Sequence, residues 1–299
     1  ISAIINELDP HSVYLPPMEL KEANEDLAGN FQGIGVEFNI FSDTVNVLYV
    51  LPNGPGDKAG IQIGDKILQV NGTALTGKKF STDEIRNNIR GPRGSQAELL
   101  LQRGSGQLTV LVTRGTIPVP SIDAAYMINK TTGYIKLNKF TESSYEEFMA
   151  ALEKLQKEGL VDLVYDLRGN GGGFMNEAVD MADEFLEGTK LIVYTQGANS
   201  KRREYRSKRP GLLEKGEIII LVDELSASAS EVLAGAVQDW DRGTIVGRRT
   251  FGKGLVQEQF DLKGGAAMRL TVARYYTPLG RSIQRPYEKG RKVYMDELW

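Results

Sequence analysis

Three closely spaced serines precede a helical pattern, and their hydroxyl groups are the first candidates for a catalytic role. Residues 226–231 read Ser-Ala-Ser-Ala-Ser-Glu, between an apolar run at 218–222 and an expected helix. A serine at such a junction lies beside unpaired backbone N–H groups and the positive end of the helix dipole, where an oxyanion is stabilised. Ser228 and Glu231 also have capping-box spacing. A capping hydroxyl is poorly placed to attack a carbonyl, so the segment alone leaves both interpretations open.

A lysine between two glycines is the second candidate. Lys253 lies between Gly252 and Gly254 in a largely apolar stretch. If it is buried, its pKa falls and its neutral amine can act as a general base; the alternative is a solvated loop lysine. The chain has no cysteine and a single histidine, His11. This composition excludes a catalytic cysteine, a disulfide and a metal site with several histidines, and it leaves Lys, Asp, Glu or Tyr as the base unless His11 serves.

A glycine-rich loop follows an apolar strand pattern. Residues 166–173 read Asp-Leu-Arg-Gly-Asn-Gly-Gly-Gly. Glycines let backbone N–H groups approach a substrate closely. The loop lacks the Gly-Lys-Ser/Thr ending of a phosphate-binding loop and the glycine spacing of a dinucleotide fingerprint. The sequence therefore favours a substrate-facing backbone over a nucleotide site.

A second glycine pair lies nearer the start of the chain. Gly33-Ile34-Gly35-Val36 precedes Gly-Asp-Lys-Ile-Leu-Gln-Val-Asn-Gly at 64–72. We expect a small barrel with an open sheet edge, in which loop amides face a peptide's terminal carboxylate and the edge strand pairs with its backbone. An ordinary hairpin with an Asn-Gly turn is the alternative. The two segments together resemble a PDZ domain.

The remaining pattern divides the chain into three parts. Residues 1–30 are expected to contain helices over 1–8 and about 18–27, and short strands with a helix over 83–90 follow up to residue 114. After Pro-Val-Pro at 118–120, a stiff linker, strands and helices alternate, which predicts an α/β fold with a largely parallel sheet. The expected strands are 133–137, 161–167, 190–195 and 217–222, the helices 145–158, 177–186 and 230–238, and the final strands 244–246, 256–261 and 267–276.

The net charge and the length of the chain argue against some classes of function. The 299 residues suffice for about two domains, and the net charge of −3, from 36 Lys+Arg and 39 Asp+Glu, argues against a nucleic-acid or anionic-membrane binder. Basic residues at 201–209 are expected to form a solvated loop. No apolar run reaches membrane-spanning length, and any targeting segment is expected outside this sequence.

The order and spacing of these segments resemble those of the C-terminal processing peptidases, also called tail-specific proteases. Leu-Asp-Pro-His-Ser at 8–12 and Tyr-Thr-Pro at 276–278 extend the resemblance over nearly the whole chain. These enzymes are serine endopeptidases with an inserted PDZ domain. The resemblance implies an α/β fold with a ClpP/crotonase-like protease core at 116–299, a PDZ β-barrel domain at 31–115 and a short N-terminal helical segment at 1–30.

The resemblance also implies a set of site residues without metal or cofactor, and a structural role for His11. The lysine of the family follows its nucleophile by 25 positions, and the glutamine that assists it lies four further on. Residues four apart on a straight strand are ~13 Å apart, so Gln257 can touch Lys253 only if the chain turns or bulges within 252–257. The implied residues are Ser228 (nucleophile), Lys253 (base), Gln257 (assisting), Ala229 and Gly172 (oxyanion donors), and Gly33, Ile34, Gly35 and Val36 (peptide binding).

The implied function is cleavage of proteins or peptides selected by their C-terminal tails. Ile34, Val36 and Phe38 are candidates to line the groove, which predicts apolar tails. The resemblance implies a cell-envelope location, periplasmic or membrane-anchored, and is compatible with a tether outside this sequence and with homo-oligomers. One alternative is a PDZ-led peptide-binding protein with an inactive protease core. Another is a lyase or hydratase on a crotonase-type fold, which polarises a thioester with backbone amides.

Overall fold

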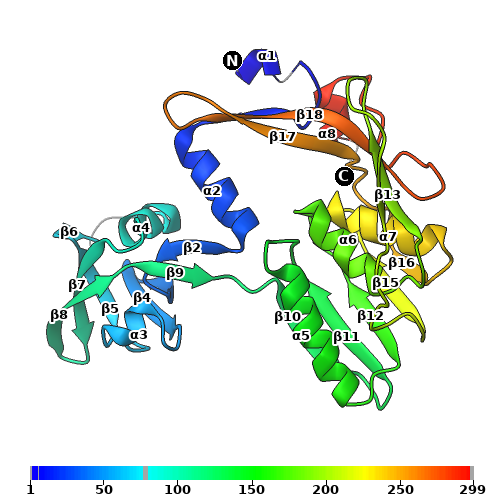
Figure 1. Cartoon of the computed structure of the whole chain (residues 1–299). Coiled ribbons are helices and arrows are strands. Elements are labelled where there is room, and N and C mark those ends of the chain that lie inside the picture. The colour runs from blue at the N-terminus through cyan, green and yellow to red at the C-terminus, as the bar shows by residue number, and fades with distance from the viewer. Residues whose placement is uncertain (1, 6, 77–79, 297–299) are drawn as a thin grey trace. The chain divides into compact units, whose positions relative to one another are not determined.

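The computed structural model describes residues 2–5, 7–76 and 80–296 (Figure 1). The chain divides into two compact units, one formed by residues 1–29 with 120–299 and the other by residues 30–119. Within the described ranges, no helix is both long and apolar enough to cross a membrane.

The smaller unit is built on an antiparallel sheet in the order β3-β4-β5-β7-β8, with β6 paired to β5. Its core contains fully buried Ile67, Leu99 and Leu101. A complete capping box between Ser81 and Glu84 begins α4, where a helix was predicted. The elements are β3 (Val36–Phe41), β4 (Thr44–Val50), α3 (Pro55–Lys58), β5 (Lys66–Val70), β6 (Thr73–Ala74), α4 (Thr82–Ile89), β7 (Gln96–Arg103) and β8 (Gly106–Thr113).

Two further strands of this unit bring the ends of the segment 30–119 together. β2 (Asn30–Gly33) pairs antiparallel with β9 (Gly115–Pro118). The prediction of a linker over 118–120 was therefore wrong at its first residue, because Pro118 ends a strand. A proline is tolerated at the end of a two-stranded ribbon, since it lacks only the N–H donor.

The central sheet of the larger unit has the order β10-β11-β12-β15-β16. Its last four strands are parallel, and β10 is antiparallel. The alternation of strands and helices predicted this for β11, β12 and β15, whereas β16 was expected only as one of the final strands. The buried rings of Phe148, Tyr165 and Phe185 pack together in its core. The elements are β10 (Ile122–Met127), β11 (Thr132–Leu137), α5 (Ser144–Lys157), β12 (Asp162–Asp166), α6 (Met175–Asp183), β15 (Ile218–Val222), α7 (Ala229–Asp239) and β16 (Thr244–Gly247).

A second sheet of the same unit has the order β1-β18-β13-β14, with β17 also on β18. The prediction that 190–195 joins the parallel sheet was wrong: this strand pairs antiparallel with β14 and β18. Local pattern predicts a strand but not its partner, which is decided by tertiary packing. The strands are β1 (Val13–Leu15), β13 (Leu191–Gln196), β14 (Arg203–Arg206), β17 (Leu255–Asp261) and β18 (Ala267–Tyr276).

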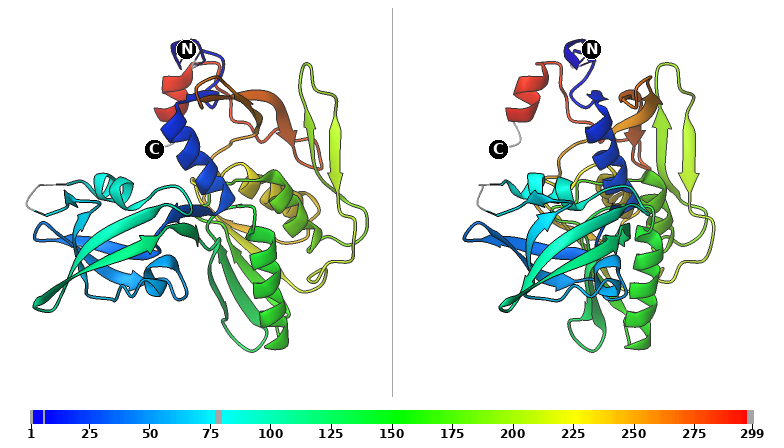
Figure 2. Two further views of the ribbon diagram at one scale, coloured as in Figure 1. Left: turned by 60° about the vertical axis from the view of Figure 1, so that its left-hand side comes forward. Right: turned by 90° about the vertical axis from the view of Figure 1, so that its left-hand side faces the viewer.

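The N-terminal segment up to Gly29 belongs to this larger unit, so the predicted separate segment 1–30 is part of it up to its last residue. α2 (Pro17–Ala28) occupies the predicted position, whereas α1 covers only Ser2–Ile5; residues 1 and 6 of the predicted first helix lie outside the described part. Figures 1 and 2 show the start of α2 beside the tip of the β17–β18 ribbon, where Pro17 lies against Gly265. α8 (Arg291–Asp296) closes the described chain. Residues of α2, β17 and β18 line one pocket together.

Candidate active site

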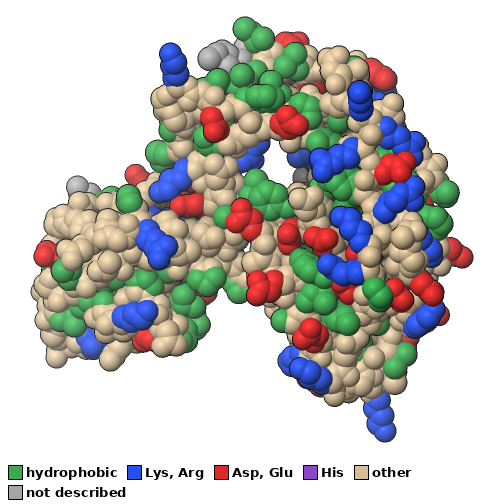
Figure 3. Space-filling model, in the orientation of Figure 1, with side chains coloured by type: hydrophobic (Ala, Val, Ile, Leu, Met, Phe, Trp, Pro, Cys, Tyr) green, Lys and Arg blue, Asp and Glu red, His purple; other side chains and the backbone are tan. Residues whose placement is uncertain are grey.

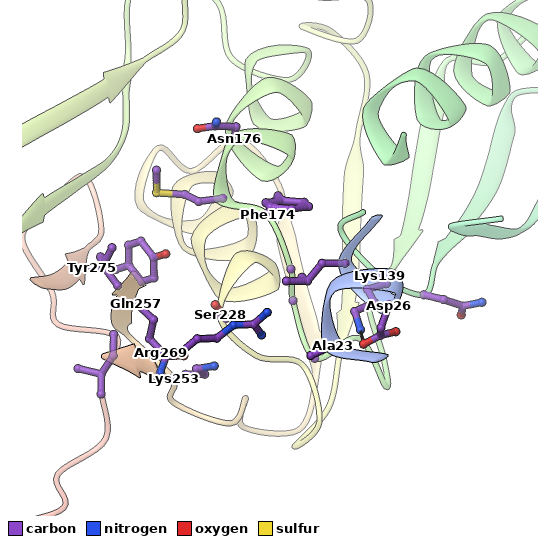
Figure 4. Close-up of a pocket in the computed structure, with 18 of the residues that line it drawn as sticks. Ala23, Asp26, Lys139, Phe174, Asn176, Ser228, Lys253, Gln257, Arg269 and Tyr275 are labelled. Carbon is purple, nitrogen blue, oxygen red and sulfur yellow. Dashed lines mark hydrogen bonds and ion pairs between the residues drawn. The ribbon is translucent and has the colours of Figure 1, made fainter. Parts of the chain in front are cut away.

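Ser228 occupies a backbone conformation that is rare for a side-chain-bearing residue. Its φ is 55° and its ψ −110°, at the point where the chain leaves β15 and enters α7. Such a conformation costs of order 1–3 kcal/mol and persists only where surrounding contacts impose it. Ser228 is 9% exposed, and its N–H donates to Glu231 Oε2 at 2.9 Å. The strained turn directs the serine toward the space beneath the β17–β18 ribbon (Figure 4).

The start of α7 does not depend on the Ser228 hydroxyl. The N–H of Glu231 donates to the carbonyl oxygen of Ser228 at 2.9 Å, and the Glu231 carboxylate returns a bond to the Ser228 N–H. Backbone and carboxylate atoms therefore satisfy the first turn. Ser228 and Glu231 also keep the predicted capping-box arrangement, so the position of the hydroxyl is compatible with both interpretations of the serine.

Glu231 connects the serine to the lysine. Its Oε2 accepts the N–H of Lys253 at 2.8 Å as well as that of Ser228. Its Oε1 accepts the Gly252 N–H and the Thr250 hydroxyl, both at 2.7 Å. Burial raises the pKa of Glu231, and these hydrogen bonds oppose that rise. The sequence indicated Glu231 only as a cap; nothing in its spacing shows that residues 250–253 fold onto the same carboxylate.

Lys253 presents a half-buried amine to the same pocket. Burial, reinforced by the positive charge of Arg269, lowers the pKa of Lys253 and favours its neutral form. Ser228 and Lys253 both line a pocket of about 620 Å³, seen as a hollow beneath the ribbon in Figure 3. In the described part of the chain, no hydrogen bond joins Ser228 Oγ to Lys253 Nζ, so the contact expected of a closed dyad is not formed here.

Gln257 is held by the N-terminal segment. The predicted bulge is present, as a register shift between Val256 and Gln257 in the β17–β18 pairing. The Gln257 Nε2 donates to the carbonyl oxygen of His11 at 2.7 Å, so its recorded contact is with the backbone of residue 11 and not with Lys253. His11 Nε2 lies 2.9 Å from the Tyr294 hydroxyl, and burial lowers the pKa of His11 to about 4. His11 is therefore neutral near pH 7 and packs among aromatic rings.

The glycine loop closes the serine side of the pocket. A Cβ on Gly172 would lie 2.8 Å from Ser228 Cβ and 2.9 Å from the Ala229 nitrogen, so only glycine fits this approach. The Gly172 N–H donates to Asn170 Oδ1 at 2.9 Å. The predicted role of Gly172 as an oxyanion donor therefore requires Asn170 to release this N–H.

Asn170 is a residue whose importance the sequence did not reveal. It is fully buried, its Nδ2 donates to the Leu137 carbonyl at 3.0 Å, and its own carbonyl accepts the Ala227 N–H and the Ser230 hydroxyl. It thereby ties the loop to the serine turn. The available signal, one asparagine within a glycine run, did not separate it from an ordinary turn residue.

The predicted peptide-binding residues lie in the smaller unit. Gly33 ends β2, Val36 begins β3, and β3 is an edge strand of its sheet. The Ile34 carbonyl accepts the Gly56 N–H at 2.7 Å. Because the peptide bond between Ile34 and Gly35 is planar and trans, the Gly35 N–H points in the opposite direction. The Ile34 side chain is only 1% exposed, so the expectation that it lines a groove was wrong: it fills the core of the unit, and Val36 and Phe38 are only partly buried.

Two family models match the chain, one within each of its two units. The model of peptidase family S41 matches residues 131–290, and a PDZ-domain model matches residues 47–103. A probable CtpA-like serine protease of Staphylococcus aureus strain N315 is 36% identical over 285 residues, 95% of this chain and 57% of the relative. A namesake from Staphylococcus epidermidis strain ATCC 12228 is 34% identical over 286 residues, with the same coverage. The chain thus spans little more than half the length of these relatives.

Two solved structures are similar to nearly the whole chain. The photosystem II D1 C-terminal processing protease superposes with a TM-score of 0.56 at 32% identity, over 94% of this chain and 77% of that one. A putative S41 protease from Bacteroides fragilis NCTC 9343 gives 0.53 at 16% identity, over 100% and 83%, which is a likeness of fold alone.

Proposed function

This chain belongs to peptidase family S41 and carries a PDZ domain, and from this premise we propose that it is a serine endopeptidase with a Ser228–Lys253 dyad. The observation that carries the proposal is the Glu231 carboxylate. One oxygen of this carboxylate accepts both the Ser228 N–H and the Lys253 N–H. A single buried anion thus keeps the two backbones together, although they are far apart in sequence.

The lysine supplies the base. The neutral Lys253 amine takes the proton of the Ser228 hydroxyl while Oγ attacks the scissile carbonyl carbon. The resulting ammonium returns a proton to the departing amine, and water then hydrolyses the acyl-enzyme. The amine must first reach the hydroxyl by rotation of the lysine side chain, which has no recorded hydrogen bond at Nζ to break within the described residues. Gln257, held through its nitrogen by His11, offers its oxygen as an acceptor for the ammonium.

Backbone amides stabilise the tetrahedral intermediate in this proposal. The Ala229 N–H lies at the first position of α7, where the helix dipole favours a negative charge. Gly172 is the second donor once its N–H leaves Asn170 Oδ1. Substrate binding would supply the stronger acceptor, because an oxyanion accepts a charge-assisted hydrogen bond.

We also propose that the PDZ domain selects substrates by their C-terminal tails. The free edge of β3 and the Gly35 N–H support strand addition and carboxylate capture. Apolar tails would meet Val36 and Phe38. The four parallel strands with α5, α6 and α7 support a ClpP/crotonase-like core. A cell-envelope location is proposed from the family resemblance alone and is tested by cell fractionation.

Peptide cleavage tests the proposal. The purified chain should cleave fluorogenic peptides and react with a fluorophosphonate probe at Ser228. Ser228→Ala and Lys253→Met should each lower kcat/KM by at least about 10⁴-fold without changing the Tm by more than a few degrees. Lys263→Met, at an exposed lysine of the β17–β18 turn, is the matched control and should match the wild type. Tail binding without cleavage would support the peptide-binding protein with an inactive core instead.

A further inference from the structure

An arginine that the proposed mechanism does not use lies in the same pocket as Ser228 and Lys253. Arg269 belongs to β18, and Figure 4 shows its side chain extending from that strand into the pocket toward Ser228. Its position is fixed by register, since β18 places it opposite Gln259 of β17 and Val13 of β1. A residue held between two paired strands presents its side chain in a defined direction.

The guanidinium group of Arg269 is held by neutral atoms. Its Nε donates to Gln259 Oε1 at 3.2 Å, and its Nη2 donates to Asn24 Oδ1 at 2.9 Å. Within the described residues, no carboxylate forms an ion pair with it, and its Nη1 has no recorded partner. A half-buried cation without an anionic partner is unfavourable, whereas arginine binds a carboxylate through two parallel hydrogen bonds.

The other charged groups of the pocket do not replace Arg269. Lys139 forms an ion pair with Asp26, and both line the pocket. Lys253 serves as the base in its neutral form. This leaves Arg269 as the pocket cation that a substrate anion can meet without first displacing a protein carboxylate.

We propose that Arg269 binds a carboxylate of the substrate next to the scissile bond and so makes the active site select for an anionic group there. This inference rests on the proposed function and adds a second level of selection, independent of the tail that the PDZ domain would bind. The carboxylate has two sources: an Asp or Glu side chain near the cleaved bond, or the α-carboxylate of a chain cleaved close to its end.

Matched peptides separate these sources. One pair carries Asp or Asn beside the cleaved bond and shares the same tail; a second pair is cleaved near its end and carries a free or an amidated C-terminus. Each pair is assayed with the wild type, Arg269→Gln, Arg269→Lys and Arg274→Gln. Arg274 is an exposed arginine of the same strand, so its variant is the matched control.

The ratio of kcat/KM within each pair is the readout, because it cancels general losses of activity. We expect the wild type to prefer the carboxylate member of at least one pair by about 10- to 100-fold, as charge-assisted hydrogen bonds would give. Arg269→Gln should bring that ratio near one, Arg269→Lys should retain part of it, and Arg274→Gln should leave it unchanged. The affected pair identifies the source of the carboxylate.

Other outcomes overturn the inference. An equal preference in wild type and Arg269→Gln, or no preference in the wild type, would show that Arg269 acts only on the pKa of Lys253 or on structure. Calorimetry keeps the two proposals separate. It measures binding of the same peptides to Ser228→Ala and to the double variant Ser228→Ala/Arg269→Gln. An Arg269-dependent preference in binding without any cleavage by the wild type would uphold the carboxylate site and overturn the peptidase function. Absence of that preference from binding and cleavage alike would overturn the carboxylate site.

Discussion

The two sides of the proposed catalytic pocket are constructed in different ways. The serine side, formed by Asn170, Gly172 and the start of α7, is buried and joined by many backbone hydrogen bonds. The amine side, formed by residues 251–257 and β18, is only partly buried; it combines the β17–β18 backbone ladder with side-chain bonds from other segments, such as that of Gln257 to His11. Glu231 joins the two sides. In the proposed dyad the buried serine turn is fixed, whereas the lysine amine still has to reach the hydroxyl, because no hydrogen bond joins Ser228 Oγ to Lys253 Nζ within the described residues.

Among the changes that test this comparison, the tight contact on the serine side gives the largest expected effect. Gly172→Ala places a methyl group 2.8 Å from Ser228 Cβ at a backbone φ of 95°, so the loop or the serine turn must shift. We expect kcat/KM to fall by about 10²–10³-fold, since shifts of about 1 Å at reacting groups cost this much. Gly171→Ala is the matched control, because a Cβ there meets no atom within 4 Å. Equal activity of both variants would show that the serine side is not rigid.

Glu231→Gln tests the connection between the two sides. The glutamine amide keeps one acceptor oxygen, but its NH₂ group would face N–H donors that in the wild type donate to the Glu231 carboxylate. We expect kcat/KM to fall by about 10–10²-fold and the Tm to decrease. Glu224→Gln, at a glutamate that pairs with Arg248 at the surface, should change neither quantity. Unchanged peptide cleavage by Glu231→Gln would contradict the role of Glu231 as the link.

The pH profile reports on the amine side. Because burial and Arg269 lower the pKa of Lys253, kcat/KM for a neutral peptide should rise with pH through a value below the ordinary 10.5 of lysine. Removing the positive charge in Arg269→Gln should move this rise to higher pH. An identical pH profile of kcat/KM in the wild type and in Arg269→Gln would show that Arg269 does not influence the pKa of Lys253.

His11 gives the smallest effect, on stability rather than on chemistry. Its pKa of about 4 in the folded chain lies below its ordinary 6.5, so the unfolded chain takes up the proton first as pH falls. The stabilisation is complete above pH 6.5 and decreases toward pH 4, by about 2 kcal/mol between pH 7.5 and pH 5. His11→Phe keeps the ring contacts with Phe251 and Tyr294, although it loses the hydrogen bond to the Tyr294 hydroxyl, and should remove this part of the pH dependence.

Urea unfolding followed by tryptophan fluorescence measures this difference, because Trp240 belongs to the larger unit, which also contains His11. If the free energy of unfolding falls equally on acidification in the wild type and in His11→Phe, His11 is not the group that titrates.

The sequence predicted the parts of this fold whose signals are local. Alternating apolar strands and helices predicted the parallel order of β11, β12 and β15, and the helical pattern over 83–90 predicted α4, whose capping box only the structure revealed. The partner of β13 was missed, because pairing between distant strands leaves no local pattern. The bulge near Gln257 was foreseen from strand geometry, but its bond to His11 was not.

The residue types of the proposed site, a serine at a helix start, a lysine between glycines and a glycine loop, were determined by the sequence itself, because each depends on a short segment. Whether these groups meet was decided only by the tertiary structure. The Glu231 carboxylate folds residues 250–253 onto the start of α7, and β18 carries Arg269 into the same pocket. Such contacts join residues far apart in the chain, and their energies depend on burial, which spacing alone does not specify.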